Sequence, residues 1–506
     1  MHTNKTNTIL LFVLIFILSV LIRIPNLNRP LSKHHEFLTA ISLRILQIWE
    51  KEGAANLRFL PRMNYEGKAN KQINNHASTT GNMKDKEGNF YYVSHPPLAY
   101  MIAYGFHFLL HFKVSVISIQ IFNLLINFLS SFFIYLILLE FFEKKSSIPL
   151  VGFIIYIFNP TVLWFQSNTY MSDILVHFFF ITTVFYLVKS KKTDFILKSK
   201  SSLLLYLSLF LMCSCSWLGY FMGGVMALFF LYKAKKQRST FIHFIFVCLI
   251  CSLALYLTVS HYSQIAGVEN YLEQMKNRYA ERGIGSSGDL FLSIIALIKK
   301  YLILVVNTYI NHGIVLSLLA IALVRYRKNT FHAFRRIPKH LLLFSSLPVL
   351  LLNLFLPDYC GHDFTSLYFS VVFTILLCSV VGLLFHYPEK LKTKHCLLIG
   401  LYILLSSLWY YGENLPGPNS IKGKPYALGM NLGKFIKERS KNELPVILIS
   451  KDVLGPETVF YAERNIFEAQ DKEEALRFLQ VNHYAEGNLI TINEENNPMH
   501  LIVKEN

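Results

Sequence analysis

A succession of apolar stretches separated by short polar loops constrains the fold of this chain more than any other feature. Eleven of them are roughly 15 to 27 residues long, which is close to the length of a helix that crosses a bilayer. They cover residues 9–22, 115–141, 147–165, 173–188, 201–217, 218–232, 240–259, 304–324, 341–357, 364–385 and 396–411. Only 16% of the residues are charged, against about 25% in soluble domains. We therefore predict a mainly α-helical, polytopic transmembrane bundle of about eleven helices and exclude a purely soluble protein.

The distribution of Lys and Arg predicts the orientation of this bundle. The short apolar stretch 98–112 contains His107 and His111, so it either crosses the membrane or lies along its surface. If it is an interfacial helix, twenty Lys and Arg residues fall in loops on one side, and the short loops on the other side contain none. Basic loops face the cytoplasm. We therefore predict a multi-pass protein of the inner (plasma) membrane, with a cytoplasmic N-terminus and an external, periplasmic C-terminus.

This topology divides the chain into two predicted domains. Residues 1–411 are the transmembrane domain, with large external loops at 25–113 and 260–300, and residues 412–506 are a small external α/β domain. The second domain has predicted strands at 446–450, near 466 and at 489–492, a helix at 472–479 and no Gly-rich phosphate loop. The net charge of +18 is explained by the cytoplasmic loops. We expect the lipid bilayer, and not nucleic acid, to be the partner of these basic residues.

Carboxylates at the external membrane boundary are few, and each is a functional candidate because an ionisable group is costly there. They are Glu36, Asp173, Asp358 and Asp363. Glu36 follows His34 and His35, and a carboxylate beside two imidazoles suits a general base or a metal ligand. Asp173 and His177 are one helical turn apart and share a helix face. The alternatives are a carboxylate paired with a nearby Lys and an interfacial helix with an ordinary polar face.

Polar and basic residues complete a candidate site on the external side. The segment 88–98 contains Tyr92 and His95, followed by two prolines that suit the start of a helix. In the second external loop lie Arg278, Arg282 and Lys300, and His362 precedes Asp363 before a late span. Positive charge at this level suits a lipid-linked phosphate. Attraction to anionic lipid headgroups is the alternative.

In this order, these motifs resemble the GT-C superfamily of polytopic glycosyltransferases, in the branch of protein O-mannosyltransferases and lipid A aminoarabinose transferases. The matching motifs are His35-Glu36, His95-Pro96-Pro97-Leu98, Asn159-Pro160 leading to Asp173, His362-Asp363-Phe364 and Tyr461-Ala-Glu-Arg-Asn465. The family usually has an Asp-Glu pair where this chain has His35-Glu36. The first carboxylate, which is commonly assigned as the base, is therefore missing here.

The resemblance implies transfer of a sugar from a polyprenyl-phosphate-linked donor to a hydroxyl of a protein, lipid or glycan on the external face. Glu36 would by preference accept the hydroxyl proton, with Asp173 and His35 as further catalytic residues. His34, His95, Tyr92, Arg278, Arg282, Lys300, His362 and Asp363 would bind the substrate and its phosphate. An oligosaccharyltransferase or ligase, and a transporter or flippase of lipid-linked saccharides, remain alternatives. No cofactor is certain, although a divalent metal ion held by His34, His35, Glu36 and His95 is possible.

Overall fold

A computed structural model describes most of the chain, and every statement below concerns the residues that it describes. These are 5–32, 35–75, 80–142, 146–192, 195–283, 339–358, 362–384, 393–414, 427–450, 453–492 and 497–504, with short pieces at 294–295, 298–299, 302, 419–421 and 424–425. The predicted span 304–324 lies outside them. Each of the other predicted spans coincides with an apolar helix or, for 147–165, with a pair of helices.

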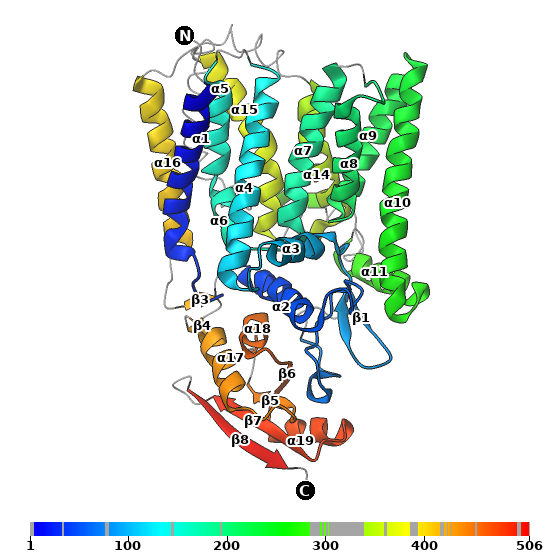
Figure 1. The fold of residues 1–506 in the computed structure, drawn as a ribbon, viewed down its shortest axis with the longest axis vertical. Helices are drawn as coiled ribbons and strands as arrows, with labels where there is room; N and C mark the ends of the chain where they lie inside the picture. Colours follow the sequence, from blue (N-terminus) through cyan, green and yellow to red (C-terminus); the bar gives the residue numbers. More distant parts are fainter. Residues whose placement is uncertain are drawn as a thin grey trace.

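The bundle consists of helices that stand side by side in Figure 1. They are α1 (Lys5–Arg23), α4 (Val116–Leu139), α5 (Ile148–Ile157), α6 (Pro160–Asn168), α7 (Ser172–Lys192), α8 (Lys200–Cys213), α9 (Leu218–Ala234), α10 (Phe241–Ala266), α14 (Lys339–Phe355), α15 (Ser366–Leu384) and α16 (Thr393–Asn414). Four helices of the described chain are long and apolar enough to cross a membrane, or up to five if a bent pair counts as one span. Six others, among them α3 (Leu98–Leu109), are apolar but shorter.

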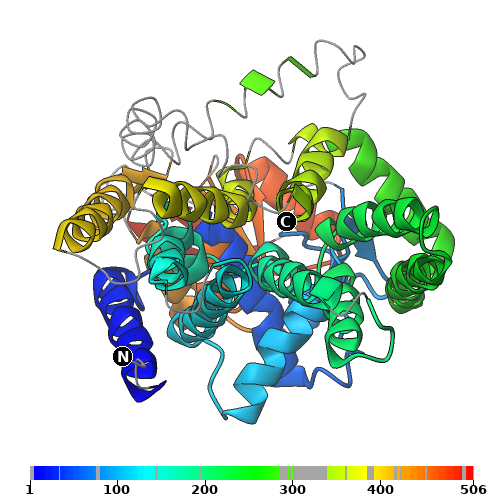
Figure 2. The same ribbon diagram turned by 90° about the horizontal axis from the view of Figure 1, so that it is seen from above.

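Burial separates the centre of the bundle from its edge. In the apolar stretch of α7, 83% of the residues are buried, whereas only 28% are buried in that of α1 and 22% in that of α10. Figures 1 and 2 place α1 and α10 at opposite edges of the bundle. Leu10 of α1 and Tyr256 of α10 are among the exposed large side chains. An apolar helix face that contacts no protein is expected where lipid is the solvent.

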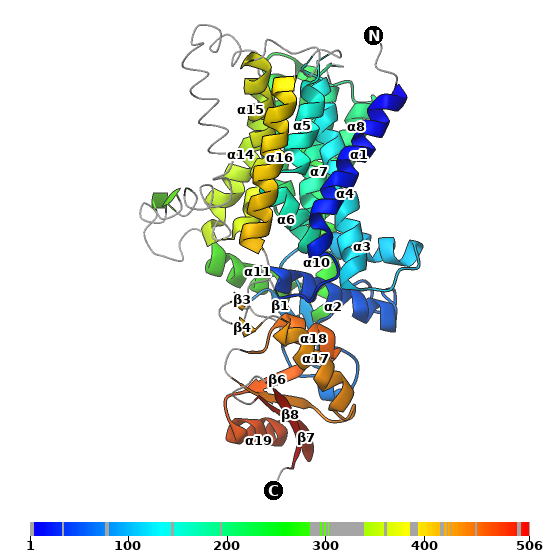
Figure 3. The same ribbon diagram turned by 90° about the vertical axis from the view of Figure 1, so that its left-hand side faces the viewer.

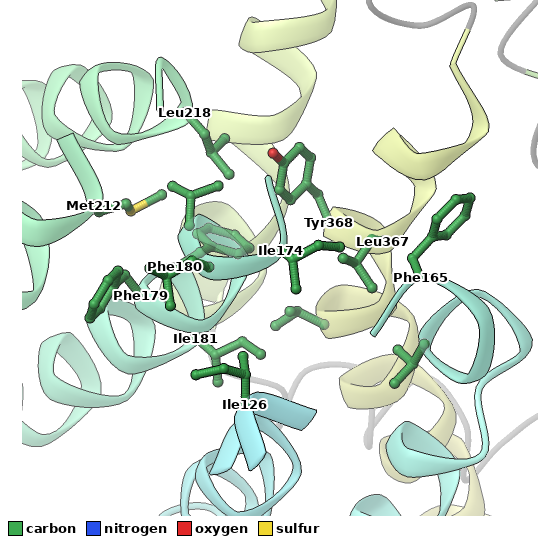
Figure 4. Close-up of a cluster of buried hydrophobic side chains, with 14 of the residues drawn as sticks. Ile126, Phe165, Ile174, Phe179, Phe180, Ile181, Met212, Leu218, Leu367 and Tyr368 are labelled. Atoms are coloured by element: carbon green, nitrogen blue, oxygen red, sulfur yellow. The ribbon is translucent and has the colours of Figure 1, made fainter. Parts of the chain in front are cut away.

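The core around α7 is built from large apolar side chains of α7 and the helices around it. Figure 4 shows Ile174, Phe180 and Ile181 of α7 surrounded by residues of α4, α8, α9 and α15. Tyr368 of α15 is part of this cluster, and its hydroxyl is the polar exception. The packing holds α7 firmly from all sides, which fixes the position of its first residues at the end of the bundle.

A break in the bundle precedes α7. Helices α5 and α6 are bent by 56° relative to each other. Asn159 caps α6 by accepting a hydrogen bond from the amide of Thr161 at 3.0 Å, and Pro160 occupies its first position. Both residues favour a helix start. The Asn159-Pro160 motif is therefore a structural device that ends one helix and starts the next.

Polar side chains of α4 donate hydrogen bonds to the last residues of α6 and to the residue that follows it. The Asn123 side chain donates to the carbonyls of Ser167 at 3.3 Å and Thr169 at 3.0 Å. Asn127, one turn further on, donates to the side chain of Gln166 at 2.9 Å. Exposed backbone polar groups are costly inside a membrane, so helix breaks there need such partners. These interactions direct the chain into α7 and toward Asp173.

Two helices lie crosswise at one end of the bundle, as Figure 1 shows. They are α2 (Glu36–Glu52) and α3 (Leu98–Leu109), and α2 is buried along most of its length. Near them lie a small hairpin of β1 (Asn82–Lys84) and β2 (Phe90–Tyr92) and the helix α11 (Val268–Arg282). Short 3₁₀ turns occur at Ile24–Asn26, Lys68–Asn70, Arg238–Thr240 and Asp363–Thr365. That residues 98–112 lie along the membrane surface stays a prediction, and α3 runs across the direction of the bundle helices.

Beyond α2 lies a unit formed by residues 427–504, called the C-terminal unit below (Figure 3). Its sheet has the order β6-β5-β7-β8, with β5 parallel to β6 and β7, and β8 antiparallel to β7. The strands are β5 (Val446–Ile449), β6 (Ile466–Ala469), β7 (Glu486–Ile492) and β8 (Pro498–Lys504), with helices α17 (Leu428–Arg439), α18 (Pro456–Ala462) and α19 (Lys472–Val481). A two-stranded ladder of β3 (Asn419–Ile421) and β4 (Lys424–Pro425) precedes it. The predicted strands and helix correspond to β5, β6, β7 and α19, whereas α17, α18 and β8 were not predicted.

Candidate active site

A cavity of about 290 Å³ opens between the crosswise helices and the end of the bundle. Its walls come from α2, the chain around β2 and α3, the start of α7, the end of α11 and the segment before α15. The lining residues are Phe37, Leu38, Ile41, Ser42, Tyr92, His95, Tyr100, Met171, Ser172, Asp173, Arg278, Glu281, Arg282, His362 and Phe364. Six residues proposed from the sequence thus meet in one cavity, although they are far apart along the chain.

Asp173 is the buried carboxylate of this cavity, with only 2% of its surface exposed. It is the second residue of α7, where the helix dipole favours negative charge. The hydroxyl of Tyr368 donates a short hydrogen bond to Oδ1, and Ser172 Oγ lies 3.4 Å from Oδ2. His177, one turn further along α7, contacts the hydroxyl of Tyr156 at 2.8 Å inside the bundle. Asp173 therefore faces the cavity, whereas His177 belongs to the core.

Two arginines of α11 provide the positive charge. Arg278 Nη1 donates to Thr80 Oγ1 at 3.0 Å and to Glu281 Oε2 at 2.8 Å. Arg282 Nε lies 3.8 Å from Asp358 Oδ2, within ion-pair range but beyond a hydrogen bond. This nitrogen is buried and has no hydrogen-bond partner among the described residues. A buried guanidinium N–H of this kind is suited to an anionic ligand.

His95 is held at the cavity by the backbone around it. Its carbonyl accepts a hydrogen bond from the Tyr262 hydroxyl at 2.6 Å, and the carbonyl of Ser94 accepts one from the Trp217 indole at 2.9 Å. The ring atom Nδ1 is buried without a hydrogen-bond partner in the described structure. Burial lowers the pKa of His95 to about 4, which outweighs the opposing effect of Asp173. The imidazole is therefore neutral near pH 7 and can donate one hydrogen bond.

His362 and Tyr92 have similarly perturbed environments. The His362 ring stacks on Phe364, with centroids 5.1 Å apart, and burial together with nearby His35 and Arg282 lowers its pKa to about 4. The Tyr92 ring centroid lies 6.1 Å from that of His95, and burial raises the pKa of its hydroxyl. Both groups are neutral at physiological pH. They add polar contacts to the cavity without adding charge.

The lowered pKa of His95 predicts a loss of stability in acid. The unfolded chain binds the proton below about pH 6.5, whereas the folded chain binds it only near pH 4. The stability that His95 contributes is therefore complete above pH 6.5 and is lost as the pH falls toward 4. At pH 4.5 the loss is about 2 kcal/mol. Chemical denaturation at pH 7 and pH 4.5 should show a smaller loss for His95→Asn than for the wild type.

The matched control for this prediction is His483, which is exposed and has a φ of 58°. Asn tolerates that conformation well, so His483→Asn should retain the acid sensitivity of the wild type. Equal losses in His95→Asn and His483→Asn would contradict the assignment of a buried, neutral imidazole at position 95.

The expected role of Glu36 as the base does not fit its position. Glu36 is only 1% exposed and does not line the cavity. Arg29 forms a two-pronged ion pair with its carboxylate, with Nη1 2.9 Å from Oε2, and the amide of Ser32 donates to Oε2 at 2.9 Å. Those contacts direct the carboxylate toward the protein and not toward the cavity. Glu36, the first residue of α2, thus has its described contacts with Arg29 and Ser32.

His35 lies close to the cavity through its ring. It has a left-handed backbone conformation, with φ at 59°, immediately before α2. Its ring centroid lies 5.8 Å from that of His362 and 5.3 Å from that of Phe364. The structure thus brings His35 near the lining residues.

Three proposed residues are not tested by the geometry. His34 and Lys300 lie outside the described residues, and only the backbone of Asp363 is described. No group of three or more His, Cys, Asp or Glu side chains suited to a metal ion occurs in the described part of the chain. Of the proposed metal set, Glu36 is bound to Arg29. The described residues therefore do not form the metal site suggested by the sequence.

Residues that were not singled out from the sequence also shape the site. Glu281 lines the cavity and binds Arg278, and Tyr368 donates to Asp173. Arg29 holds Glu36 and lies over the Trp164 ring, with its guanidinium carbon 5.6 Å from the ring centroid. The sequence could have indicated Glu281, because it lies one helical turn from Arg278 in a polar stretch. Tyr368 lies in an apolar run and gave no signal of its own.

Comparison with known proteins identifies the fold. No family model and no curated protein matches the sequence. Among solved structures, ArnT from Cupriavidus metallidurans bound to undecaprenyl phosphate matches with a TM-score of 0.60 and 12% identity, covering 97% of this chain and 94% of ArnT. The oligosaccharyltransferase AglB from Archaeoglobus fulgidus, in complex with an inhibitory peptide and a dolichol-phosphate, gives 0.57 and 10%, covering 95% and 69%. The chain therefore has the fold of these two proteins, the GT-C fold.

Proposed function

We propose that this chain is a membrane glycosyltransferase that moves a sugar from a polyprenyl-phosphate-linked donor to a hydroxyl acceptor. The observation that carries the proposal is the cavity, which combines the buried Asp173 carboxylate with Arg278, Arg282 and two neutral imidazoles. The two structural neighbours hold undecaprenyl phosphate and dolichol-phosphate. A lipid-linked phosphate is the ligand that this set of donors suits.

The proposed reaction is a direct displacement at the anomeric carbon of the sugar. The acceptor hydroxyl oxygen forms the new bond as Asp173 accepts its proton, and the bond from the anomeric carbon to the phosphate oxygen breaks. The electron pair of that bond leaves on the polyprenyl phosphate. Tyr368 orients the Asp173 carboxylate through its hydrogen bond to Oδ1. Asp173 replaces Glu36 as the proposed base because it alone of the two lines the cavity.

The leaving phosphate is stabilised by Arg278 and Arg282 in this proposal. Preorganised donors in a water-poor site stabilise charge that develops in the transition state. Arg282 supplies a buried N–H without a protein hydrogen bond among the described residues. His95 and His362 are neutral and add hydrogen bonds to phosphate or sugar oxygens. None of the described residues of the C-terminal unit lines the cavity.

The external face is the proposed side of the reaction. Asp173 begins α7 and Lys191 lies near its other end, about 30 Å away along a helix of this length. Lys191 therefore lies at the end of the bundle opposite to the cavity, which supports a cytoplasmic position for that end. The proposed acceptor is a protein, lipid or glycan hydroxyl reached from the periplasm, with the chain in the inner membrane.

A related candidate is an oligosaccharyltransferase or ligase that moves a whole glycan. The likeness to the oligosaccharyltransferase AglB supports it, because its TM-score of 0.57 is close to the 0.60 of ArnT. A transporter or flippase is less well supported, because such proteins bind their substrate near the middle of the membrane. Here the cavity is lined by residues of α2, α3, α11 and the start of α7, and these elements lie at one end of the bundle in Figure 1. Donors carrying one sugar or a longer glycan would separate the first two activities.

The proposed role of Arg282 is tested by replacing it with Gln. The change removes a cationic donor to the phosphate, and a charge-assisted hydrogen bond contributes about 1.5–3 kcal/mol. We expect polyprenyl phosphate to bind about 10–100-fold more weakly to Arg282→Gln than to the wild type. Binding of the lipid to purified protein in detergent is measured by native mass spectrometry or by competition.

Arg58 offers a matched control on the same end of the protein. It is exposed, and its guanidinium contacts Gln264 at 3.4 Å outside the cavity. Arg58→Gln should bind the lipid as the wild type does. Equal weakening by both substitutions would point to general attraction of the lipid to surface charge, and would contradict the phosphate site.

A further inference from the structure

The segment Tyr461–Asn465, which the sequence resemblance singled out, lies outside the cavity but contacts the chain that forms one of its walls. We propose that Tyr461 is a positioning residue for sugar transfer, which fixes the Arg29–Glu36 segment and through it the start of α2. The inference rests on the proposed function for its effect on catalysis. The contacts that carry it are independent of that function.

The first contact links the C-terminal unit to the segment that follows α1. The Tyr461 hydroxyl accepts a hydrogen bond from the amide of Leu31 at 3.1 Å. Leu31 is only 2% exposed and belongs to the core of the bundle, as does Phe460 beside Tyr461. Burial raises the pKa of Tyr461 to about 12. The hydroxyl is therefore neutral at any physiological pH, and the contact does not depend on pH.

The second contact joins Leu31 to α2. The next residue, Ser32, donates its amide to Glu36 Oε2 at 2.9 Å, and Arg29 binds both oxygens of the same carboxylate. Glu36 is the first residue of α2. Tyr461 thus binds Leu31, which lies along the chain between the two partners of the Arg29–Glu36 ion pair.

The third step leads from α2 to the cavity. Phe37, Leu38, Ile41 and Ser42, all in the first two turns of α2, line it. His35, just before the helix, packs against His362 and Phe364, which also line it. A small shift of a positioning element is enough to lower the rate of a reaction that depends on alignment. The position of α2 therefore sets the fit of the substrate beside Asp173.

The C-terminal unit provides a fixed base for Tyr461. Asn465 Oδ1 accepts from the amide of Tyr65 at 2.9 Å, and the Asn75 side chain exchanges hydrogen bonds of 2.7 and 3.0 Å with the backbone of Ile466. Figure 3 shows α18 lying next to α2, on the side away from the bundle. Since several other contacts dock the unit, loss of the Tyr461 hydroxyl alone should leave it in place.

The chain offers a matched pair of variants. The Tyr484 hydroxyl donates to the carbonyl of Lys68 at 2.6 Å, and so also links the C-terminal unit to the region between α2 and α3. Lys68 is remote in sequence from α2 and does not line the cavity. Tyr461→Phe and Tyr484→Phe therefore each remove one docking hydrogen bond, but only the first acts on the Arg29–Glu36 segment.

Two measurements test the inference. In a transfer assay with a polyprenyl-phosphate-linked sugar, Tyr461→Phe should lower kcat about tenfold with little change in the KM of the donor, and Tyr484→Phe should retain the wild-type kcat. In hydrogen exchange followed by mass spectrometry, Tyr461→Phe should speed exchange in peptides covering 29–38. Tyr484→Phe should speed exchange around Lys68 instead. Adding Glu36→Gln to Tyr461→Phe should lower kcat no further than Glu36→Gln alone, because both act on the same segment.

The outcomes separate this inference from the proposed function. Equal kcat values for Tyr461→Phe and the wild type, or equal losses in the two Tyr→Phe variants, would overturn the positioning role. Unchanged exchange at 29–38 in Tyr461→Phe would overturn it even without an activity assay. A wild-type protein with no transfer activity would refute the proposed function, whereas faster exchange at 29–38 in Tyr461→Phe alone would still support the structural link.

Discussion

Replacing Asp173 with Asn is expected to lower kcat for sugar transfer by about 10²–10⁴-fold, the range that general-base catalysis contributes. The amide keeps the size of the side chain and can still accept the hydrogen bond from Tyr368, but it cannot accept the proton of the acceptor hydroxyl. Donor binding should change little, since Arg278 and Arg282 remain. Initial rates at saturating donor and acceptor, with the unfolding midpoint of each protein, measure the effect.

Asp471 provides the control, because it is also an Asp at the start of a helix. Its side chain accepts a hydrogen bond from the amide of Glu474 at 2.8 Å, far along the chain in the C-terminal unit. Asn caps helices about as well as Asp, so Asp471→Asn should keep both stability and activity. Transfer by Asp173→Asn at the wild-type rate would exclude Asp173 as the base.

Replacing Arg29 with Ala is expected to destabilise the protein by about 3–5 kcal/mol, because it leaves a buried carboxylate without its partner. The side chains of Arg29 and Glu36 are only 6% and 1% exposed. Chemical denaturation in detergent at pH 7 measures the loss. A second substitution, Glu36→Gln, removes the unpaired charge, so the double variant should recover part of the lost stability.

A surface ion pair serves as the comparison for Arg29. Lys504 Nζ lies 3.0 Å from Glu486 Oε1 at the edge of the C-terminal sheet, and the two side chains are 70% and 33% exposed. Lys504→Ala should cost less than about 1 kcal/mol. If Arg29→Ala cost no more than Lys504→Ala, Glu36 would not be a buried structural carboxylate, and its proposal as the base would regain support.

The sequence predicted the parts of the site that stand out from their surroundings. Asp173 is an acid at the end of an apolar run, and His95 precedes two prolines at a helix start. Such residues are visible in the sequence, because a charge beside an apolar run is costly and proline restricts the backbone. Both lie at the cavity. The apolar helices were equally easy to predict, because a helix long enough to cross a bilayer needs about 20 mostly apolar residues.

The role of Glu36 could not be read from the sequence. Its partner Arg29 precedes it by seven residues, and only the folded loop brings the guanidinium to the carboxylate. The contributions of Tyr368 and Tyr461 depend on contacts across 195 and 430 residues. A hydroxyl in an apolar run is common in helix cores, so its hydrogen-bond partner is revealed only by tertiary structure.

One measurement tests the central claim, that the cavity supports chemical transfer and not movement of an intact lipid. Wild-type protein is reconstituted in liposomes with a polyprenyl-phosphate-linked sugar labelled in the sugar, and a hydroxyl acceptor is added. We expect the label to appear in the acceptor, with free polyprenyl phosphate released in equal amount, and neither to occur with Asp173→Asn. Label that changes leaflet but stays attached to its lipid, at the same rate in the wild type and in Asp173→Asn, would contradict the account.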